Sequence, residues 1–93
     1  MTAELEPNWV DAYRRAQRVR QESLDMLMRK ANVVGVGVGF RMVHGQRTKQ
    51  VVLVVMVDSK VPLADLRPAD IVPDEIQGVP VDVQETGEFS IHT

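Results

Sequence analysis

The first third of the chain has a spacing of apolar residues that is typical of an amphipathic helix. Residues 9–31 contain no glycine or proline, and good helix formers dominate this stretch. Asn8 precedes it as a suitable N-cap, while Arg20 interrupts the apolar stripe and is expected at its edge. The stripe, in steps of three, four or eight residues, comprises Trp9, Tyr13, Ala16, Leu24, Leu27 and Ala31. The pattern predicts one long helix over residues 8–31, with a length of about 35 Å.

The pattern changes to alternation after Asn32, where we expect the helix to end. Within residues 33–43 the even positions are apolar, and the odd positions include Gly35, Gly37 and Gly39. This alternation predicts a strand with one apolar face and one face without side chains. Because glycine weakens a strand, we expect close backbone packing at these three positions.

Two further strands are predicted beyond a polar hairpin loop over residues 44–49. The strand 50–58 contains seven consecutive apolar residues, 51–57, and therefore predicts a central strand that is covered on each side. The strand 79–85 contains Pro80, which cannot donate to a ladder, so we expect an edge strand.

Prolines divide the segment between these strands, and it predicts two short helical turns, over residues 62–66 and 73–76. The whole chain, 1–93, is predicted to be a single α+β domain. Its long N-terminal helix (8–31) packs on a small three- to four-stranded, mainly antiparallel sheet within residues 32–88, and residues 89–93 form a tail.

The composition is that of an ordinary globular domain, with 44% hydrophobic and 26% charged residues and no cysteine. The lack of cysteine excludes disulfides, thiolate metal sites and cysteine nucleophiles, and it is typical of intracellular chains. No apolar run approaches the roughly 20 residues that span a bilayer. We therefore expect a cytoplasmic protein with no membrane partner.

The net charge of −2 is divided unevenly along the chain. Residues 1–57 carry nine basic and five acidic side chains, for +4, whereas residues 58–93 carry two basic and eight acidic ones, for −6. This division favours head-to-tail self-association or the steering of a charged partner. A fold that mixes both signs on one surface is the alternative.

No arrangement of residues supports catalysis or cofactor binding. The three glycines do not form the dinucleotide-binding fingerprint, because they lie within a strand and Phe40 follows them directly. His44 and His92 lack the sequence context of a catalytic triad. The carboxylates within residues 65–75 lack the spacing of a calcium loop. The sequence therefore predicts no enzyme activity, no cofactor and no metal site.

One face of the predicted helix is basic, since Arg18 lies three residues after Arg15 and four residues after Arg14. The overall acidity and the aromatic content of only 4% count against nucleic acid, which stays the weaker alternative. A protein contact is favoured. Its predicted residues are the apolar anchors Trp9, Tyr13, Leu24 and Leu27 and the charged rim Arg14, Arg15 and Arg18.

A single helix covers only one face of a sheet, yet the segment 51–57 is apolar on both faces. The second face must meet the C-terminal segments or another subunit, so we expect a homo-oligomer. The predicted function is a non-enzymatic protein-interaction or self-assembly module, as a structural subunit of an oligomer or filament. A regulatory domain that binds a small ligand on the glycine-lined strand face is the alternative.

A family resemblance covers residues 31–88. It rests on Asn32-Val-Val-Gly-Val-Gly-Val-Gly-Phe40, Lys60-Val-Pro-Leu63, Leu66, Pro68, Ile71-Val-Pro73, Ile76, Gly78-Val-Pro-Val-Asp-Val83 and Gly87. This segment resembles the module that precedes the protease domain in bacterial and plant trypsin-like serine peptidases of the narrow-leaf type. The resemblance implies a stand-alone accessory module that docks, regulates or assembles, with a trypsin-like peptidase as one partner, and it carries over no catalytic residue.

Overall fold

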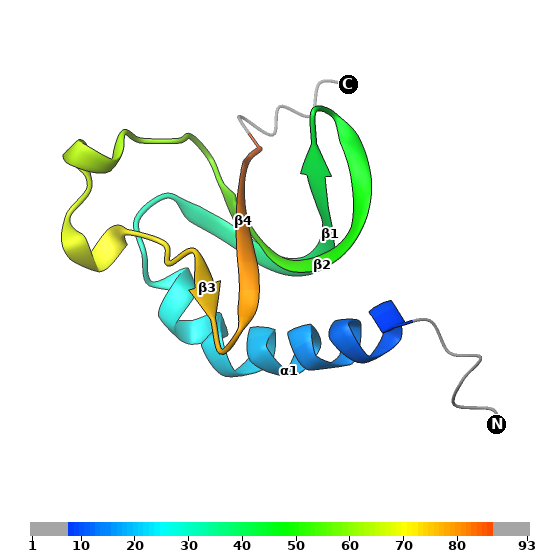
Figure 1. Ribbon diagram of the computed structural model, residues 1–93. Coiled ribbons are helices and arrows are strands. Elements are labelled where there is room, and N and C mark those ends of the chain that lie inside the picture. Colours follow the sequence, from blue (N-terminus) through cyan, green and yellow to red (C-terminus); the bar gives the residue numbers. More distant parts are fainter. Residues whose placement is uncertain (1–7, 87–93) are drawn as a thin grey trace, which may run out of the picture.

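The computed structural model describes residues 8–86, which form one long helix and a four-stranded sheet (Figure 1). In chain order the elements are α1 (Asn8–Met28), β1 (Val33–Val43), β2 (Gln46–Val57), η2 (Leu63–Asp65), η3 (Pro68–Asp70), β3 (Glu75–Ile76) and β4 (Val79–Glu85). The strand order is β1-β2-β4-β3, and α1 lies across one face of the sheet. This confirms the predicted α+β architecture. The predicted tail over 89–93 lies outside the described residues.

Helix α1 ends at Met28, three residues before the predicted end. The chain then turns, with Lys30 N–H donating to the Leu27 carbonyl (3.1 Å). Asn32 adopts a φ of +73°, a left-handed conformation that asparagine tolerates better than most residues. Asn32 thus closes the helical segment as expected, but regular helical hydrogen bonding stops earlier. The residues that α1 buries are Ala16, Val19, Ser23 and Leu27.

Strands β1 and β2 form an antiparallel hairpin in which Val38 lies opposite Leu53. His44 and Gly45 connect them, with φ of +51° and +77°. Two successive positive φ angles are the geometry of a two-residue type I′ turn, whose twist matches the hairpin. The predicted loop over residues 44–49 is therefore wrong, because β2 already begins at Gln46.

Strand β4 runs parallel to β2, with Leu53 opposite Val81, and antiparallel to the short β3. The prediction of an edge strand holds for residues 81–85, which pair with β2 and have no strand among the described residues on their other side, whereas the short β3 pairs with Val79 and Pro80. Pro80, which lies opposite Glu75 of β3, has no N–H to donate to the ladder. The next residue makes the hydrogen bond instead, because the Val81 N–H donates to the Asp74 carbonyl (2.8 Å).

The connection between β2 and β4 agrees with the prediction only in part. The turn expected within residues 62–66 is present as the 3-10 helix η2. The prediction of a helical turn over 73–76 is wrong, because this segment contains the strand β3. The second 3-10 helix is η3, which lies earlier in the connection. Pro68 sits in the first turn of η3, where its missing N–H is not needed.

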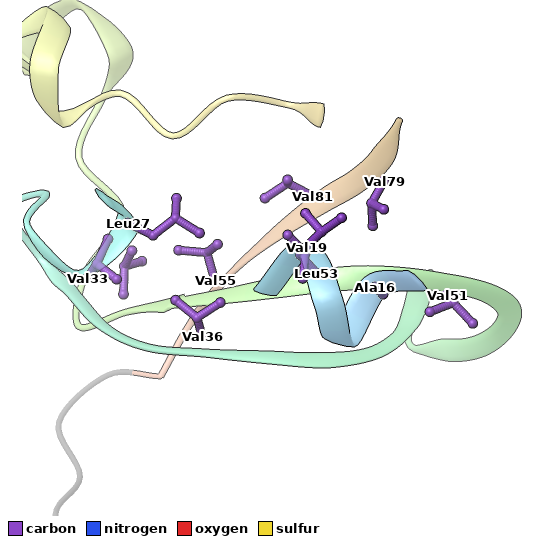
Figure 2. Close-up of a cluster of buried hydrophobic side chains, with 11 residues drawn as sticks. Ala16, Val19, Leu27, Val33, Val36, Val51, Leu53, Val55, Val79 and Val81 are labelled. Carbon is purple, nitrogen blue, oxygen red and sulfur yellow. The ribbon is translucent and has the colours of Figure 1, made fainter. Parts of the chain in front are cut away.

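The hydrophobic core lies between α1 and one face of the sheet (Figure 2). Leu27 from the helix and Leu53 and Val55 from β2 belong to this core, and all three are fully buried. Strand β2 is central, as predicted, and α1 packs on one of its faces. On the opposite face Val52 is fully buried, and Val54 and Met56 are half-buried.

Candidate interaction surface

The first turn of α1 is joined to the β1–β2 hairpin through aromatic contacts. The ring centroids of Trp9 and Phe40 are 6.0 Å apart, at an interplanar angle of 71°, which is a favourable edge-to-face arrangement. On the hairpin, the Arg47 guanidinium carbon lies 5.3 Å from the Phe40 ring centroid, within range of a cation–π interaction. Trp9 nevertheless keeps 43% of its surface exposed. The contacts therefore orient the indole without burying it.

These residues line an open hollow, which we call the aromatic–basic hollow and which comprises Trp9, Phe40, Arg47, Thr48 and Lys49. The Thr48 hydroxyl donates to the Arg41 carbonyl (2.9 Å) and accepts from Gln50 N–H (3.2 Å), which fixes the backbone of this part of β2. Among residues 8–86, two cationic side chains and no carboxylate line the hollow. It therefore combines aromatic surface with positive charge and suits an acidic segment that carries an apolar side chain.

Of the predicted contact residues, Arg14 and Arg18 lie on the exposed side of α1, whereas Tyr13 lies at the edge of the core. Tyr13 is half-buried against the core, and its hydroxyl accepts from the Gln17 side-chain amide (3.0 Å). Arg14 pairs with Asp11 at 3.6 Å, in an exposed ion pair of the kind that contributes little to stability. Arg18 is exposed.

Arg15 docks α1 against the turn between β3 and β4. Its Nη2 donates to the Gln77 carbonyl at 2.9 Å, and a Cβ at Gly78 would lie 2.6 Å from the same nitrogen. Gln77 and Gly78 both have positive φ, and the Gln77 side chain donates to Glu22 (3.0 Å). Arg15 is thus held by contacts within the subunit.

Two predicted anchors face inward. Leu27 is fully buried in the core, and Leu24 is half-buried against it, because the inward stripe of α1 continues through Val19 and Ser23. Leu27 is therefore a core residue of this subunit and not part of its surface. The exposed contact surface of α1 is accordingly narrower than predicted.

The three glycines of β1 differ in their surroundings. A Cβ at Gly35 would lie 3.0 Å from the Met56 methyl carbon, and one at Gly39 would lie 3.3 Å from a Val54 methyl carbon. Gly37 has no such neighbour within 4 Å. Side chains of β2 thus lie close to the backbone at two of the three positions, and the face is open at the third.

Sequence reasoning missed Phe40, Arg47 and Lys49 as parts of the hollow. The signal was a polar residue followed by glycine at positions 44 and 45, which is typical of a two-residue hairpin turn. A turn there places residues 47–49 on a strand beside Phe40, whereas a six-residue loop leaves their positions open.

The described residues define a small α+β domain with an exposed aromatic and basic surface at the start of its helix. A family model for the NARROW LEAF 1 N-terminal domain matches residues 16–84, and the chain belongs to this family. No curated protein matches the chain. Trp9 lies outside the matched residues, whereas Phe40, Arg47 and Lys49 lie within them.

Residues 8–86 lack the features of two other kinds of site. No helix in this part of the chain is both long and apolar enough to cross a membrane. Within the same range, no three histidine or carboxylate side chains come together in a group that could hold a metal ion.

Proposed function

We propose that this domain is a non-enzymatic interaction module that associates with a second copy of itself through the aromatic–basic hollow. One observation carries the proposal: Trp9 is held against Phe40 with 43% of its surface exposed, beside Arg47 and Lys49. Exposed tryptophan and arginine are the residue types that dominate binding energy at protein interfaces. Arg14 and Arg18 extend the positive charge along α1.

The charge distribution supports a second copy as the partner. The connection between β2 and β4 carries the exposed carboxylates Asp58, Asp65 and Asp74. In Figure 1, the η2 and η3 turns of this connection lie at the opposite end of the molecule from the start of α1. Opposite charges at opposite ends favour a head-to-tail contact, which produces rings or open filaments according to its rotation.

Trp9→Ala tests this proposal, with Met28→Ala as a matched control. Met28 is also 43% exposed on α1 but does not line the hollow. Size-exclusion chromatography with light scattering at micromolar concentration is expected to show oligomers for the wild type and Met28→Ala, and monomers for Trp9→Ala. Arg47→Glu should also dissociate the oligomer, and salt should weaken it.

Two outcomes would contradict the proposal. A wild type that stays a monomer under these conditions excludes self-association, and an oligomer that survives Trp9→Ala places the contact elsewhere.

A trypsin-like peptidase is the second partner that we propose, supported by the resemblance of residues 31–88 to the module beside such protease domains. The absence of cysteine fits a cytoplasmic location for either assembly.

A further inference from the structure

A cavity of about 220 Å³ lies beyond the end of α1, beneath the connection between β2 and β3. Eight aliphatic side chains dominate its lining, and they are Ala31, Val57, Val61, Leu63, Leu66, Ile71, Val72 and Val83. Val57 belongs to the core, and Val72 and Val83 pack against it, so the cavity extends the core outward. An apolar cavity of about 150 Å³ suffices to hold benzene. This one has room for a larger apolar group.

The outer wall of the cavity is fixed before any ligand arrives. The buried Asp70 side chain accepts from Ala31 N–H (3.0 Å) through one oxygen and from Arg67 Nε (3.1 Å) through the other. Lys30 Nζ also donates to the Ala69 carbonyl (2.7 Å). These contacts tie η3 to the end of α1. A preformed wall reduces the entropic cost of binding.

The polar lining residues differ in what they leave available to a ligand. Both Asp70 oxygens are already engaged by protein donors. Lys60 is exposed at the rim, and within residues 8–86 its ammonium group makes no hydrogen bond or ion pair. Ser59, next to it in the lining, adds a hydroxyl group. Among the described residues, the lining therefore offers positive charge at its opening and no free carboxylate, and it favours an anionic head group.

We propose that this cavity binds a small aliphatic carboxylate of about six to eight carbons. Its hydrocarbon chain fills the aliphatic interior, and its carboxylate pairs with Lys60. Leu63, which is 67% exposed at the lip, becomes covered when the chain enters. The cavity and the aromatic–basic hollow share no residue, whereas the connection that covers the cavity also carries the carboxylates of the proposed head-to-tail contact.

Methyl NMR titration of the full chain tests the site with three probes. Octanoate has both the chain and the charge, 1-octanol has the chain without the charge, and acetate has the charge without the chain. Octanoate is expected to shift the methyl signals of Leu63, Leu66, Ile71 and Val83 in a saturable manner. 1-Octanol should shift the same signals more weakly, and acetate should leave them unchanged.

Two variants separate the charge from the cavity. Lys60→Gln changes an exposed side chain and should weaken octanoate about two- to fivefold, as expected for an exposed ion pair, without changing the affinity for 1-octanol. Ala31→Leu puts a larger side chain into the lining, from an exposed position whose backbone contact with Asp70 is kept, and should weaken both probes.

The proposal is overturned if octanoate leaves the four methyl signals unchanged, as it would if a segment of the chain already filled the cavity. It is also overturned if Ala31→Leu binds octanoate as tightly as the wild type does. Equal weakening of octanoate and 1-octanol by Lys60→Gln would exclude the carboxylate as the recognised group.

Discussion

The two faces of the β1–β2 hairpin are built from the same apolar strand, yet they are covered in different ways. Facing α1, Val51, Leu53 and Val55 of β2 are all buried beneath the helix. On the other face, which α1 does not cover, Val52 is fully buried and Val54 and Met56 are half-buried. The face without the helix is therefore buried unevenly, fully at Val52 and partly at Val54 and Met56.

The glycines of β1 explain how the face without the helix is partly covered. Gly35 and Gly39 pair with β2 and carry no side chains, so Met56 and Val54 lie close to the backbone of the neighbouring strand. Part of the apolar surface is thus covered sideways within the sheet. The helix face is stabilised by packing against the side chains of α1. On the glycine face, the lack of side chains in β1 lets the side chains of β2 contact the neighbouring backbone.

Substitutions at adjacent positions of β2 should separate the two faces most clearly. Leu53→Ala removes a fully buried side chain from the core and should lower the free energy of unfolding by about 2–5 kcal/mol. Val54→Ala, at a half-buried position, should lower it by about 1 kcal/mol. Urea unfolding followed by circular dichroism measures both. Similar losses for the two variants would show that the glycine face is as tightly packed as the core.

A second substitution tests the boundary of the helix face, where Asp70 joins η3 to the end of α1. The pKa of Asp70 lies below its ordinary value of 3.8, because its carboxylate accepts from the Ala31 backbone N–H and the Arg67 side chain, with Lys30 also nearby. A carboxyl group whose pKa is lower in the folded state stabilises the fold above the unfolded-state pKa. This contribution is lost as the pH falls through the folded-state pKa.

Asp70→Asn should therefore lower the melting temperature at neutral pH, and the difference from the wild type should shrink as the pH falls below 3.8. Thermal unfolding over this pH range measures the effect. Asp65→Asn, at an exposed carboxylate of η2, is the matched control. A difference between wild type and Asp70→Asn that does not change with pH would assign the loss to packing, not to the charge of Asp70.

The smallest expected effect distinguishes two glycines on the same face. Gly37→Ala meets open space and restricts the unfolded chain, so it should be neutral or stabilise by up to about 1 kcal/mol. Gly35→Ala requires the Met56 methyl group to move and should be less stable than Gly37→Ala. The comparison uses the same urea unfolding. The reverse order would mean that a neighbour approaches Gly37 more closely than Gly35.

Local patterns predicted the elements whose signals lie within a few residues. Alternation placed β1 at residues 33–43 and β4 at residues 79–85, and Asn8 marked the start of α1. The inward stripe of α1 was predicted only in part, because a step of eight residues passed over Val19 and Ser23, which the helix buries. A buried serine resembles a surface residue when only hydrophobicity is read.

Features that depend on contacts between distant segments could not be predicted. The parallel pairing of β2 with β4 and the strand β3 are decided by how the connection folds back, which leaves no local period. The cavity depends on Asp70, whose carboxylate reaches Ala31 across 39 positions of the chain. The hollow required the hairpin turn at residues 44–45 before its members could be brought together.

Trp9 is the only tryptophan in the chain, and it lies at the surface that we propose for contact. Its intrinsic fluorescence therefore comes from one known place, half exposed against the Phe40 ring. Desolvation of the indole by a partner would move its emission toward the blue, and separation of α1 from the hairpin would move it toward the red. The domain thus contains its own optical probe for assembly, and no label has to be introduced.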